Sequence, residues 1–185
     1  MIRSTKPAGR GTALFMSAAA ATLAVLSSAV PAQADQTPGP PGGATTIRNG
    51  NSGQCLEIAD SSKSNGARAQ QWTCVGQAGS YWYFEPVVKG GASYYRIRNT
   101  NSNKCLEVAD SRTDNGAPVQ QWTCYDLPGQ LWYKTGTPLP GVAGLVNANS
   151  GKCLEVADSR TDKGAPVQQW SCSDIWTKTW SWSGM

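Results

Sequence analysis

The sequence contains no histidine, and this absence narrows the chemistry that the protein can perform. Without histidine, neither a Ser-His-Asp nor a Cys-His catalytic arrangement can form, and most zinc sites are excluded as well. Charge is also scarce: charged residues make up 15% of the chain, and 16 basic against 12 acidic residues give a net charge of +4. Because three of the basic residues (Arg3, Lys6 and Arg10) lie at the N-terminus, the rest of the chain is close to neutral. A nearly neutral domain without a basic stripe is not expected to bind nucleic acid.

Long apolar runs are missing after residue 34, so no later segment is expected to insert into a membrane. Before that point, the basic N-terminal residues precede an Ala/Leu/Val-rich run at 12–30 and a small-residue box, Ala32-Gln33-Ala34. This order predicts a secretory signal peptide over residues 1–34, with an uncleaved membrane anchor as the alternative. Cleavage after Ala34 leaves 151 of the 185 residues as a secreted, extracellular domain.

One unit of sequence occurs three times after a Pro/Gly-rich segment, 35–43, that predicts an extended spacer. The repeats lie at about 44–90, 91–141 and 142–185, and together they form the predicted domain 44–185. Their most similar parts are NSGQCLEIADSSKSNGARAQQWTC from residue 51, NSNKCLEVADSRTDNGAPVQQWTC from residue 101 and NSGKCLEVADSRTDKGAPVQQWSC from residue 149. The first cysteines of the repeats are 50 and 48 residues apart. Self-similarity at this period indicates one structural unit per repeat.

The repeats predict an all-β fold. They are rich in Gly, Pro, Asn, Asp and Ser, and they lack apolar residues at helical spacing. Short alternating stretches such as YYRIRN, CLEVAD and PVQQW predict about four strands per repeat, or about twelve in all. Three four-stranded units that close into a barrel with a hairpin cap form a β-trefoil, and closure explains why three copies are needed.

Strand alternation assigns each repeated side chain to one face. The inward set is Leu56, Leu106, Leu154, Ile58, Val108, Val156, Ala69, Val119 and Val167. The outward set is Cys55, Cys105, Cys153, Glu57, Glu107, Glu155, Gln70, Gln120, Gln168, Trp72, Trp122, Trp170, Cys74, Cys124 and Cys172. Gln71, Gln121 and Gln169 also point inward, where they need backbone partners.

The six cysteines occur as one pair per repeat, each pair nineteen residues apart, which in an exported chain indicates a disulfide framework. Six cysteines allow fifteen pairings, and the repeat selects Cys55–Cys74, Cys105–Cys124 and Cys153–Cys172. Metal binding is the alternative, but the pairs lack a zinc-like Cys-x-x-Cys spacing, and we expect neither a metal nor another cofactor.

Each repeat therefore offers an outward carboxylate, amide and indole, which together suit a sugar. A carboxylate accepts hydrogen bonds from neighbouring hydroxyls, an amide donates and accepts, and an indole covers the C–H face of a pyranose. A repeated tryptophan can instead be a core residue, but a second set, Trp82, Trp132 and Trp180, is predicted to fill the core.

The motifs C-L-E-[IV] and Q-Q-W-[TS]-C, followed by Gln130-Leu131-Trp132, resemble the ricin B-type lectin repeat, which also occurs in family 13 carbohydrate-binding modules. The resemblance covers 44 to about 182 and implies a β-trefoil with up to three shallow sites for galactose-, mannose- or xylose-type sugars. It also implies that the Glu57, Gln70 and Trp72 positions of each repeat bind the sugar.

The chain departs from this family in carrying Glu where Asp is usual, so Asp60, Asp110 and Asp158, three residues later, are further candidates. The predicted sugar-binding residues are Glu57, Asp60, Asn65, Gln70 and Trp72 in the first repeat, Glu107, Asp110, Asn115, Gln120, Trp122 and Gln130 in the second, and Glu155, Asp158, Gln168 and Trp170 in the third. The second repeat keeps every element and is predicted to bind neutral sugars best. Lys163 and Lys178 predict a preference for acidic sugars in the third.

Two other classes of function remain open. A glycoside hydrolase could use Glu57 and Asp60 as a carboxylate pair, but catalytic pairs occur once, whereas this pair recurs in every repeat. A trefoil interaction protein, such as a protease inhibitor or a toxin-like subunit, would instead present one unusual exposed loop. We therefore expect a monomeric carbohydrate-binding protein without enzymatic activity.

The first prediction concerns processing and oxidation. The secreted protein should begin near Asp35 and carry no free thiol, because all six cysteines are paired. Intact-mass measurement before and after alkylation without reduction checks both points. Alkylation of all six cysteines in the native protein would contradict the disulfide framework.

Overall fold

Twelve strands form the part of the chain described by the structure, a computed structural model, which comprises residues 43–136, 142–172 and 176–182. The predicted signal peptide, and the predicted spacer apart from Gly43, lie outside these residues. The strands of the first repeat are β1 (Thr45–Asn49), β2 (Cys55–Ile58), β3 (Ala69–Trp72) and β4 (Tyr81–Lys89). Those of the second are β5 (Ala92–Asn99), β6 (Cys105–Val108), β7 (Val119–Trp122) and β8 (Trp132–Gly136). Those of the third are β9 (Val142–Asn147), β10 (Cys153–Val156), β11 (Val167–Trp170) and β12 (Thr179–Trp182).

Short 3₁₀ turns connect the strands at equivalent places in the three repeats. The turns after β2, β6 and β10 are η2 (Ala59–Ser61), η4 (Ala109–Ser111) and η6 (Ala157–Ser159). The turns before β4, β8 and β12 are η3 (Ala78–Ser80), η5 (Pro128–Gln130) and η7 (Trp176–Lys178). None of the helical turns in this part of the chain has the length or hydrophobicity of a membrane span.

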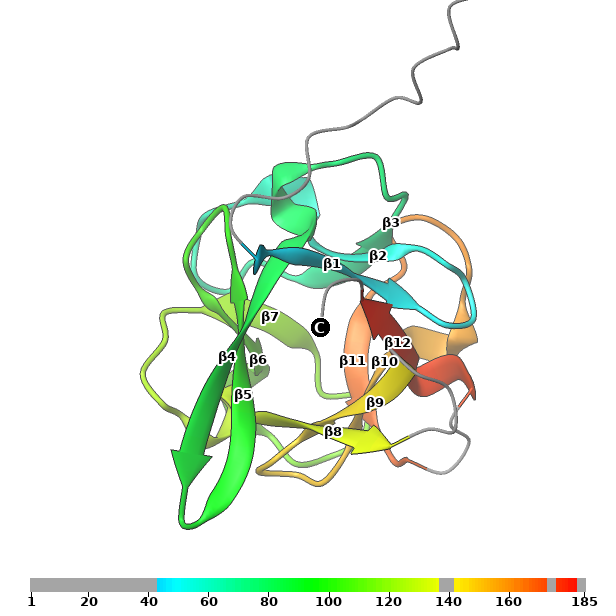
Figure 1. The fold of residues 1–185 in the computed structure, drawn as a ribbon. Coiled ribbons are helices and arrows are strands. Elements are labelled where there is room, and N and C mark those ends of the chain that lie inside the picture. Colours follow the sequence, from blue (N-terminus) through cyan, green and yellow to red (C-terminus); the bar gives the residue numbers. More distant parts are fainter. Residues whose placement is uncertain (1–42, 137–141, 173–175, 183–185) are drawn as a thin grey trace, which may run out of the picture. The chain divides into compact units, whose positions relative to one another are not determined.

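Six strands close into a barrel, two from each repeat (Figure 1). Going around it, β1 pairs with β4, β4 with β5, β5 with β8, β8 with β9, β9 with β12, and β12 returns to β1. All six pairings are antiparallel, and closure leaves the barrel without an open sheet edge. The predicted β-trefoil is therefore confirmed.

The other six strands form three hairpins, β2–β3, β6–β7 and β10–β11, which make up the cap. One disulfide crosses each hairpin, from the start of its first strand to the second residue after its last strand. The three predicted pairings, Cys55–Cys74, Cys105–Cys124 and Cys153–Cys172, are confirmed. Each bond closes a loop of nineteen residues and restricts the unfolded chain by about 3 kcal/mol.

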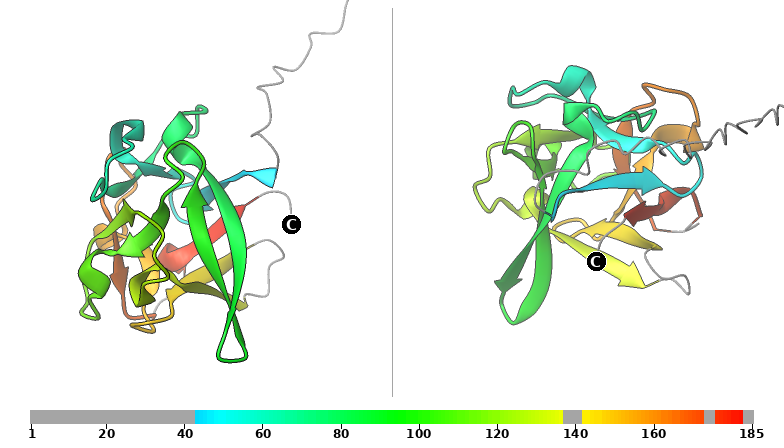
Figure 2. Two further views of the ribbon diagram at one scale, coloured as in Figure 1. Left: turned by 90° about the vertical axis from the view of Figure 1, so that its left-hand side faces the viewer. Right: turned by 45° about the horizontal axis from the view of Figure 1, so that its top comes forward.

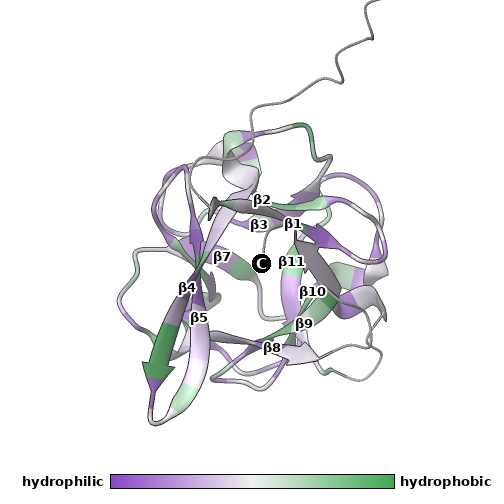
Figure 3. Ribbon diagram, viewed as in Figure 1, coloured by the Kyte–Doolittle hydropathy of each residue, from purple (hydrophilic) through white to green (hydrophobic). Residues whose placement is uncertain are grey.

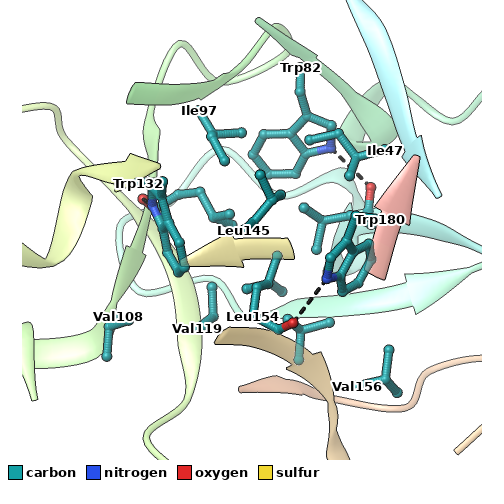
Figure 4. Close-up of a cluster of buried hydrophobic side chains, with 14 of the residues drawn as sticks. Ile47, Trp82, Ile97, Val108, Val119, Trp132, Leu145, Leu154, Val156 and Trp180 are labelled. Carbon is teal, nitrogen blue, oxygen red and sulfur yellow. Dashed lines mark hydrogen bonds between the residues drawn. The ribbon is translucent and has the colours of Figure 1, made fainter. Parts of the chain in front are cut away.

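The core is built around the predicted tryptophans Trp82, Trp132 and Trp180, all fully buried (Figure 4). Each indole N–H donates to a leucine carbonyl oxygen of its own repeat, so no polar atom of the indole is left unpaired. The three bonds run to Leu56, Leu106 and Leu154, at 3.0, 3.0 and 2.9 Å respectively. The predicted inward aliphatic residues pack with them in one cluster, as expected.

Three buried glutamines, Gln71, Gln121 and Gln169, tie each repeat to another one. Their Oε1 atoms accept from the hydroxyls of Ser52, Ser102 and Ser150, each at 2.6 Å. Their Nε2 atoms donate to two carbonyl oxygens of a neighbouring repeat: Arg160 and Asp162 for Gln71, Ser62 and Ser64 for Gln121, and Arg112 and Asp114 for Gln169. The predicted need for backbone partners is thus met, and the bonds run cyclically around the molecule.

The hairpin of β4 and β5 extends past the end of the barrel (Figure 2). The hydrophobic end of β4 lies at its tip, where Val88 is exposed (Figure 3). At its base, the Lys134 ammonium lies 4.2 Å from the ring centroid of Phe84, 4.1 Å from that of Tyr95 and 4.7 Å from that of Trp182. Burial lowers the pKa of Lys134 to about 8, and these cation–π contacts favour the charged form.

The glutamine ties lead to a graded stability prediction. Gln121→Leu removes the partner of the Ser102 hydroxyl and of two carbonyl oxygens, and we expect it to lower the free energy of unfolding by about 3 kcal/mol. Ser102→Ala removes one of these bonds and should cost about 1 kcal/mol. Urea unfolding of both variants measures the difference, and equal losses would contradict the proposed role of the glutamine.

Candidate functional site

Each cap hairpin brings one glutamate, one glutamine and one tryptophan together. In β2–β3, Cys55 lies opposite Trp72 and Glu57 lies opposite Gln70, and the other two hairpins have the same register. The glutamine amide therefore reaches the carboxylate across the strand pair. The Nε2–Oε distances are 3.5 Å for Gln70 and Glu57, 3.0 Å for Gln120 and Glu107, and 2.9 Å for Gln168 and Glu155.

The glutamates do not lie on the open surface as the sequence predicted. Glu57, Glu107 and Glu155 are only 4, 4 and 6% exposed, and their neighbours Cys55, Cys105 and Cys153 are buried as well. Alternation correctly separated these side chains from the barrel core, but the 3₁₀ turns before β4, β8 and β12 contribute residues that cover them. The outward placement of the tryptophans is correct, since Trp72 is 36% and Trp170 40% exposed and Trp122 is half-buried.

A different residue faces the second carboxylate oxygen in each repeat. In the second, Gln130 Nε2 donates to Glu107 Oε2 at 2.7 Å and to the Thr123 carbonyl oxygen at 2.8 Å. In the third, Lys178 Nζ lies 3.2 Å from Glu155 Oε2, and both side chains are 8% exposed. Lys178 is therefore engaged in a buried ion pair.

The first repeat has the short side chain Ser80 at the equivalent position. Ser80 is fully buried, and its hydroxyl has no hydrogen-bond partner among the described residues. Gln77 takes over one role of Gln130, since its Oε1 accepts from the Val75 N–H at 3.2 Å. In the second repeat the Gln130 Oε1 accepts the equivalent bond from Tyr125 at 3.0 Å.

The environment of Glu57 disfavours its charged form. Burial raises its pKa above the ordinary value of 4.5, and the nearby Asp60 carboxylate raises it further, against the lowering effect of the Gln70 hydrogen bond. Within the described residues, Glu57 is thus a buried carboxylate held by one long hydrogen bond, at 3.5 Å.

The accessible carboxylates are instead Asp60, Asp110 and Asp158. All three are exposed and lie in η2, η4 and η6, with left-handed φ angles of 56°, 55° and 55°. Aspartate adopts this conformation more readily than most residues, because its short side chain can bond locally to the backbone. The turn raises the aspartate beside the hairpin that carries the tryptophan.

In the second repeat these groups surround a cavity of about 420 Å³. Its lining residues are Glu107, Asp110, Ser111, Gln120, Trp122 and Leu127. Four of the six residues predicted for this site are therefore together, and Gln130 lies behind them on Glu107. Sequence reasoning missed Ser111 and Leu127. The available signal for Leu127 was that the repeats differ most after their second cysteine.

The predicted site residues Asn65 and Asn115 belong to the neighbouring repeat's site, not to their own. Asn65 Oδ1 accepts from the Thr123 N–H at 3.0 Å and from its hydroxyl at 3.1 Å. Asn115 Oδ1 does the same with Ser171, at 3.0 and 3.2 Å. The repeated sequence could not reveal this exchange, because it arises where the cap hairpins of neighbouring repeats pack against each other, as in the bridges of Arg68 with Gln120 and of Pro118 with Gln168.

A glycine follows each of these loop residues and lies against the neighbouring tryptophan. A Cβ at Gly66 would be 3.6 Å from Trp122, and Gly66 has a φ of +78°, which side chains rarely adopt. Gly164 has the same relation to Trp72. Each candidate site is therefore composite, with the tryptophan from one repeat and the loop from another.

The sequence matches one protein family, described as ricin-type beta-trefoil lectin domain-like, over residues 32–122, 78–170 and 128–183. The overlapping matches extend through all three repeats and include every hairpin described above. The chain belongs to this family. No curated protein sequence matches the chain significantly.

Solved structures similar to this ricin-type trefoil include a designed protein and natural ones. The designed threefold symmetric protein ThreeFoil is 29% identical, with a TM-score of 0.72 over 78% of this chain and 100% of its own. An exo-β-1,3-galactanase from Clostridium thermocellum is 29% identical, with a TM-score of 0.70 over 77% of this chain and 30% of its own. The Macrolepiota procera ricin B-like lectin, solved with lactose, shares the fold at 15% identity, with a TM-score of 0.61 over 75% of this chain and 93% of its own.

Glu57 and Glu155 should respond differently to substitution by glutamine. The folded-state pKa of Glu57 is raised, so the folded protein binds the proton more tightly than the unfolded chain does. The free energy of unfolding therefore falls as the pH rises from the unfolded-state pKa through the folded-state pKa of Glu57. Glu57→Gln should therefore raise Tm near neutral pH, and the gain should shrink towards about pH 4.

The matched variant is Glu155→Gln, which removes the charge facing the buried Lys178. It should lower the free energy of unfolding by about 3 kcal/mol at neutral pH. Thermal unfolding of both variants across this pH range checks the pair. A loss for Glu57→Gln as large as that for Glu155→Gln would contradict this description of the two carboxylates.

Proposed function

We propose that the mature chain is a secreted carbohydrate-binding protein whose second repeat forms the strongest site for neutral sugars. The observation that carries the proposal is the 420 Å³ cavity in which Trp122, Asp110 and Gln120 converge. Family membership supports the same class of ligand. Galactose-, mannose- and xylose-type sugars are the candidates that the resemblance implies.

In this proposal the second-repeat site recognises the two faces of a sugar separately. The Trp122 indole covers the C–H face, and the exposed Asp110 carboxylate accepts hydrogen bonds from neighbouring hydroxyls. Glu107 is a positioning residue, because it holds the amides of Gln120 and Gln130 at 3.0 and 2.7 Å. Leu127 adds apolar contact at the rim.

The proposal does not include hydrolysis. A glycosidase needs two carboxyl groups that flank the scissile bond and exchange protons with it. In the second repeat both Glu107 oxygens accept amide hydrogen bonds, and in the third Glu155 is held by Gln168 and Lys178. These two glutamates are engaged in holding their sites together, and in the first repeat Glu57 is 4% exposed and bonded to Gln70.

Secretion is part of the proposal. The basic, apolar and small-residue order of the N-terminal sequence favours export. Three disulfides with no free cysteine are typical of proteins that fold in an oxidising compartment.

The test compares three matched tryptophan variants. Trp122→Ala should weaken the binding of neutral oligosaccharides more than Trp72→Ala or Trp170→Ala, because only the second repeat keeps both amides on its glutamate. Loss of the stacking face should cost about 1–2 kcal/mol at that site. Titration calorimetry with galactose-, mannose- and xylose-type oligosaccharides measures the effect.

The ranking is wrong if Trp122→Ala binds like the parent while another variant loses affinity. If the parent and all three variants bind none of these sugars, the proposed function itself fails. Thermal unfolding of each variant provides the folding control, since all three indoles lie outside the core cluster.

A further inference from the structure

One loop position differs between the three composite sites. The loops carry Asn65, Asn115 and Lys163 at equivalent places, each directly before the glycine that lies against a tryptophan. Asn65 and Asn115 supply an acceptor oxygen to the N–H and hydroxyl of Thr123 and Ser171. Lysine has no acceptor, so the third loop cannot supply this oxygen.

Lys163 lies at the first-repeat site, although the sequence analysis assigned it to the third. Gly164 donates its N–H to the Gln71 carbonyl oxygen at 2.9 Å, and Gln71 Nε2 donates to the Asp162 carbonyl oxygen at 2.9 Å. These bonds hold the residues on both sides of Lys163 against the first repeat, just before Trp72 and Thr73. Lys178, the other lysine from which the sequence predicted a preference for acidic sugars, forms an ion pair with Glu155. The acidic-sugar preference predicted for the third repeat is therefore misplaced.

Thr73 is the residue equivalent to Thr123 and Ser171. Among the described residues, no side chain accepts from its N–H or its hydroxyl, whereas both equivalents donate two hydrogen bonds to asparagine. The two donors of Thr73 directly follow the exposed Trp72, and the loop that carries Lys163 packs against the Trp72 indole, since a Cβ on the next residue, Gly164, would lie 3.6 Å from it. The group has donors and positive charge but lacks the acceptor found at the other two sites.

The neighbouring acidic groups are Asp60 and Asp162. Asp60 follows the end of the hairpin where Ile58 pairs with Ala69, whereas Thr73 follows the opposite end, where Cys55 pairs with Trp72. Asp162, adjacent to Lys163, is paired with Arg160, whose hydrogen bond lowers the pKa of Asp162. The second site also has a lysine, Lys104, with Nζ 3.4 Å from the Thr123 hydroxyl oxygen, but there Asn65 already fills the acceptor position. The equivalent of Lys104 at the first site, Gln54, donates its amide to the Thr161 carbonyl oxygen. The missing acceptor, more than the lysine alone, distinguishes the first site.

We propose that the first-repeat site, formed by Trp72, Thr73 and Lys163, binds the carboxylate of a hexuronic acid. One carboxylate oxygen takes the place that Asn65 Oδ1 has at the second site and accepts from the Thr73 N–H and hydroxyl. The other oxygen faces the Lys163 ammonium, and the Trp72 indole covers the sugar ring. Charge-assisted bonds of this kind are stronger than those between neutral groups. The inference rests on the proposed carbohydrate-binding function and assigns different ligands to two of its sites.

The test uses the mature protein and two surfaces, one displaying galacturonic acid and one displaying galactose, which differ only at C6. Lys163→Asn copies the residue of the other two loops, restoring the acceptor and removing the charge. It should weaken galacturonate binding about tenfold, as expected for loss of a charge-assisted hydrogen bond, and should not weaken galactose binding, which the second-repeat site provides. Lys163→Met removes only the charge and should give a smaller loss than Lys163→Asn.

Asn65→Lys transfers the first-site arrangement to the second and should strengthen galacturonate binding there, in a background where Trp72→Ala removes the first site. Since Asn65 bonds to Thr123, the Lys163 variants decide the question if Asn65→Lys is poorly folded.

A galacturonate-to-galactose affinity ratio that is the same in the parent and in Lys163→Asn overturns the inference. If galactose binding remains sensitive to Trp122→Ala in that case, the proposed function stands. If neither surface binds the parent, both proposals fail.

Discussion

The buried glutamine of each cap hairpin is the contact on which the rest of this trefoil depends. The side chains of Gln71, Gln121 and Gln169 each accept a hydrogen bond from a serine hydroxyl of their own repeat. Each also donates hydrogen bonds to two backbone carbonyl oxygens of a neighbouring repeat. Since the three glutamine side chains are fully buried, a bond that one of them failed to make would cost more than a bond that it makes gains. The glutamines therefore fix where each neighbouring loop lies. That position brings Gly66 against Trp122 and Gly164 against Trp72, which makes the candidate sites composite.

Because the glutamine hydrogen bonds are the same in all three repeats, the side chains around each glutamate can differ at little cost to the fold. The glutamate at the centre of each hairpin keeps its strand partner, while its second contact is an amide in one repeat and an ammonium in another. The first repeat has neither, and a glutamine from a different position, Gln77, replaces one of the lost bonds. Three sites of different polarity therefore share one backbone. Sites on one rigid body can engage a repeating polymer together, which strengthens binding without any new contact.

The sequence predicts the parts of this structure that depend on short-range patterns. Repetition gives the trefoil and the disulfide pairs, and alternation separates Trp82 from Trp72 and turns Gln71 inward. Alternation cannot predict how exposed a side chain is. It assigns Glu107 to the outer face of its strand but does not reveal that Gln130, which comes later in the chain, covers it. Repetition also assigns Asn65 to its own repeat, whereas packing between the cap hairpins brings it to Thr123, 58 residues later. These errors have one origin: in a cyclic fold the neighbour in space is often in another repeat.

The barrel closes through the pairing of β1 with β12, in which Ile47 lies opposite Trp182. The first and last strands of the domain are therefore neighbours, and the link between the third repeat and the first has the same kind of contacts as the other two links. Cutting the chain between any two repeats and joining β12 to β1 by a short linker would preserve every strand pair and every glutamine tie. The domain should accordingly tolerate circular permutation at its repeat boundaries. In such permuted chains the order of the sites along the sequence changes, while their arrangement in space does not.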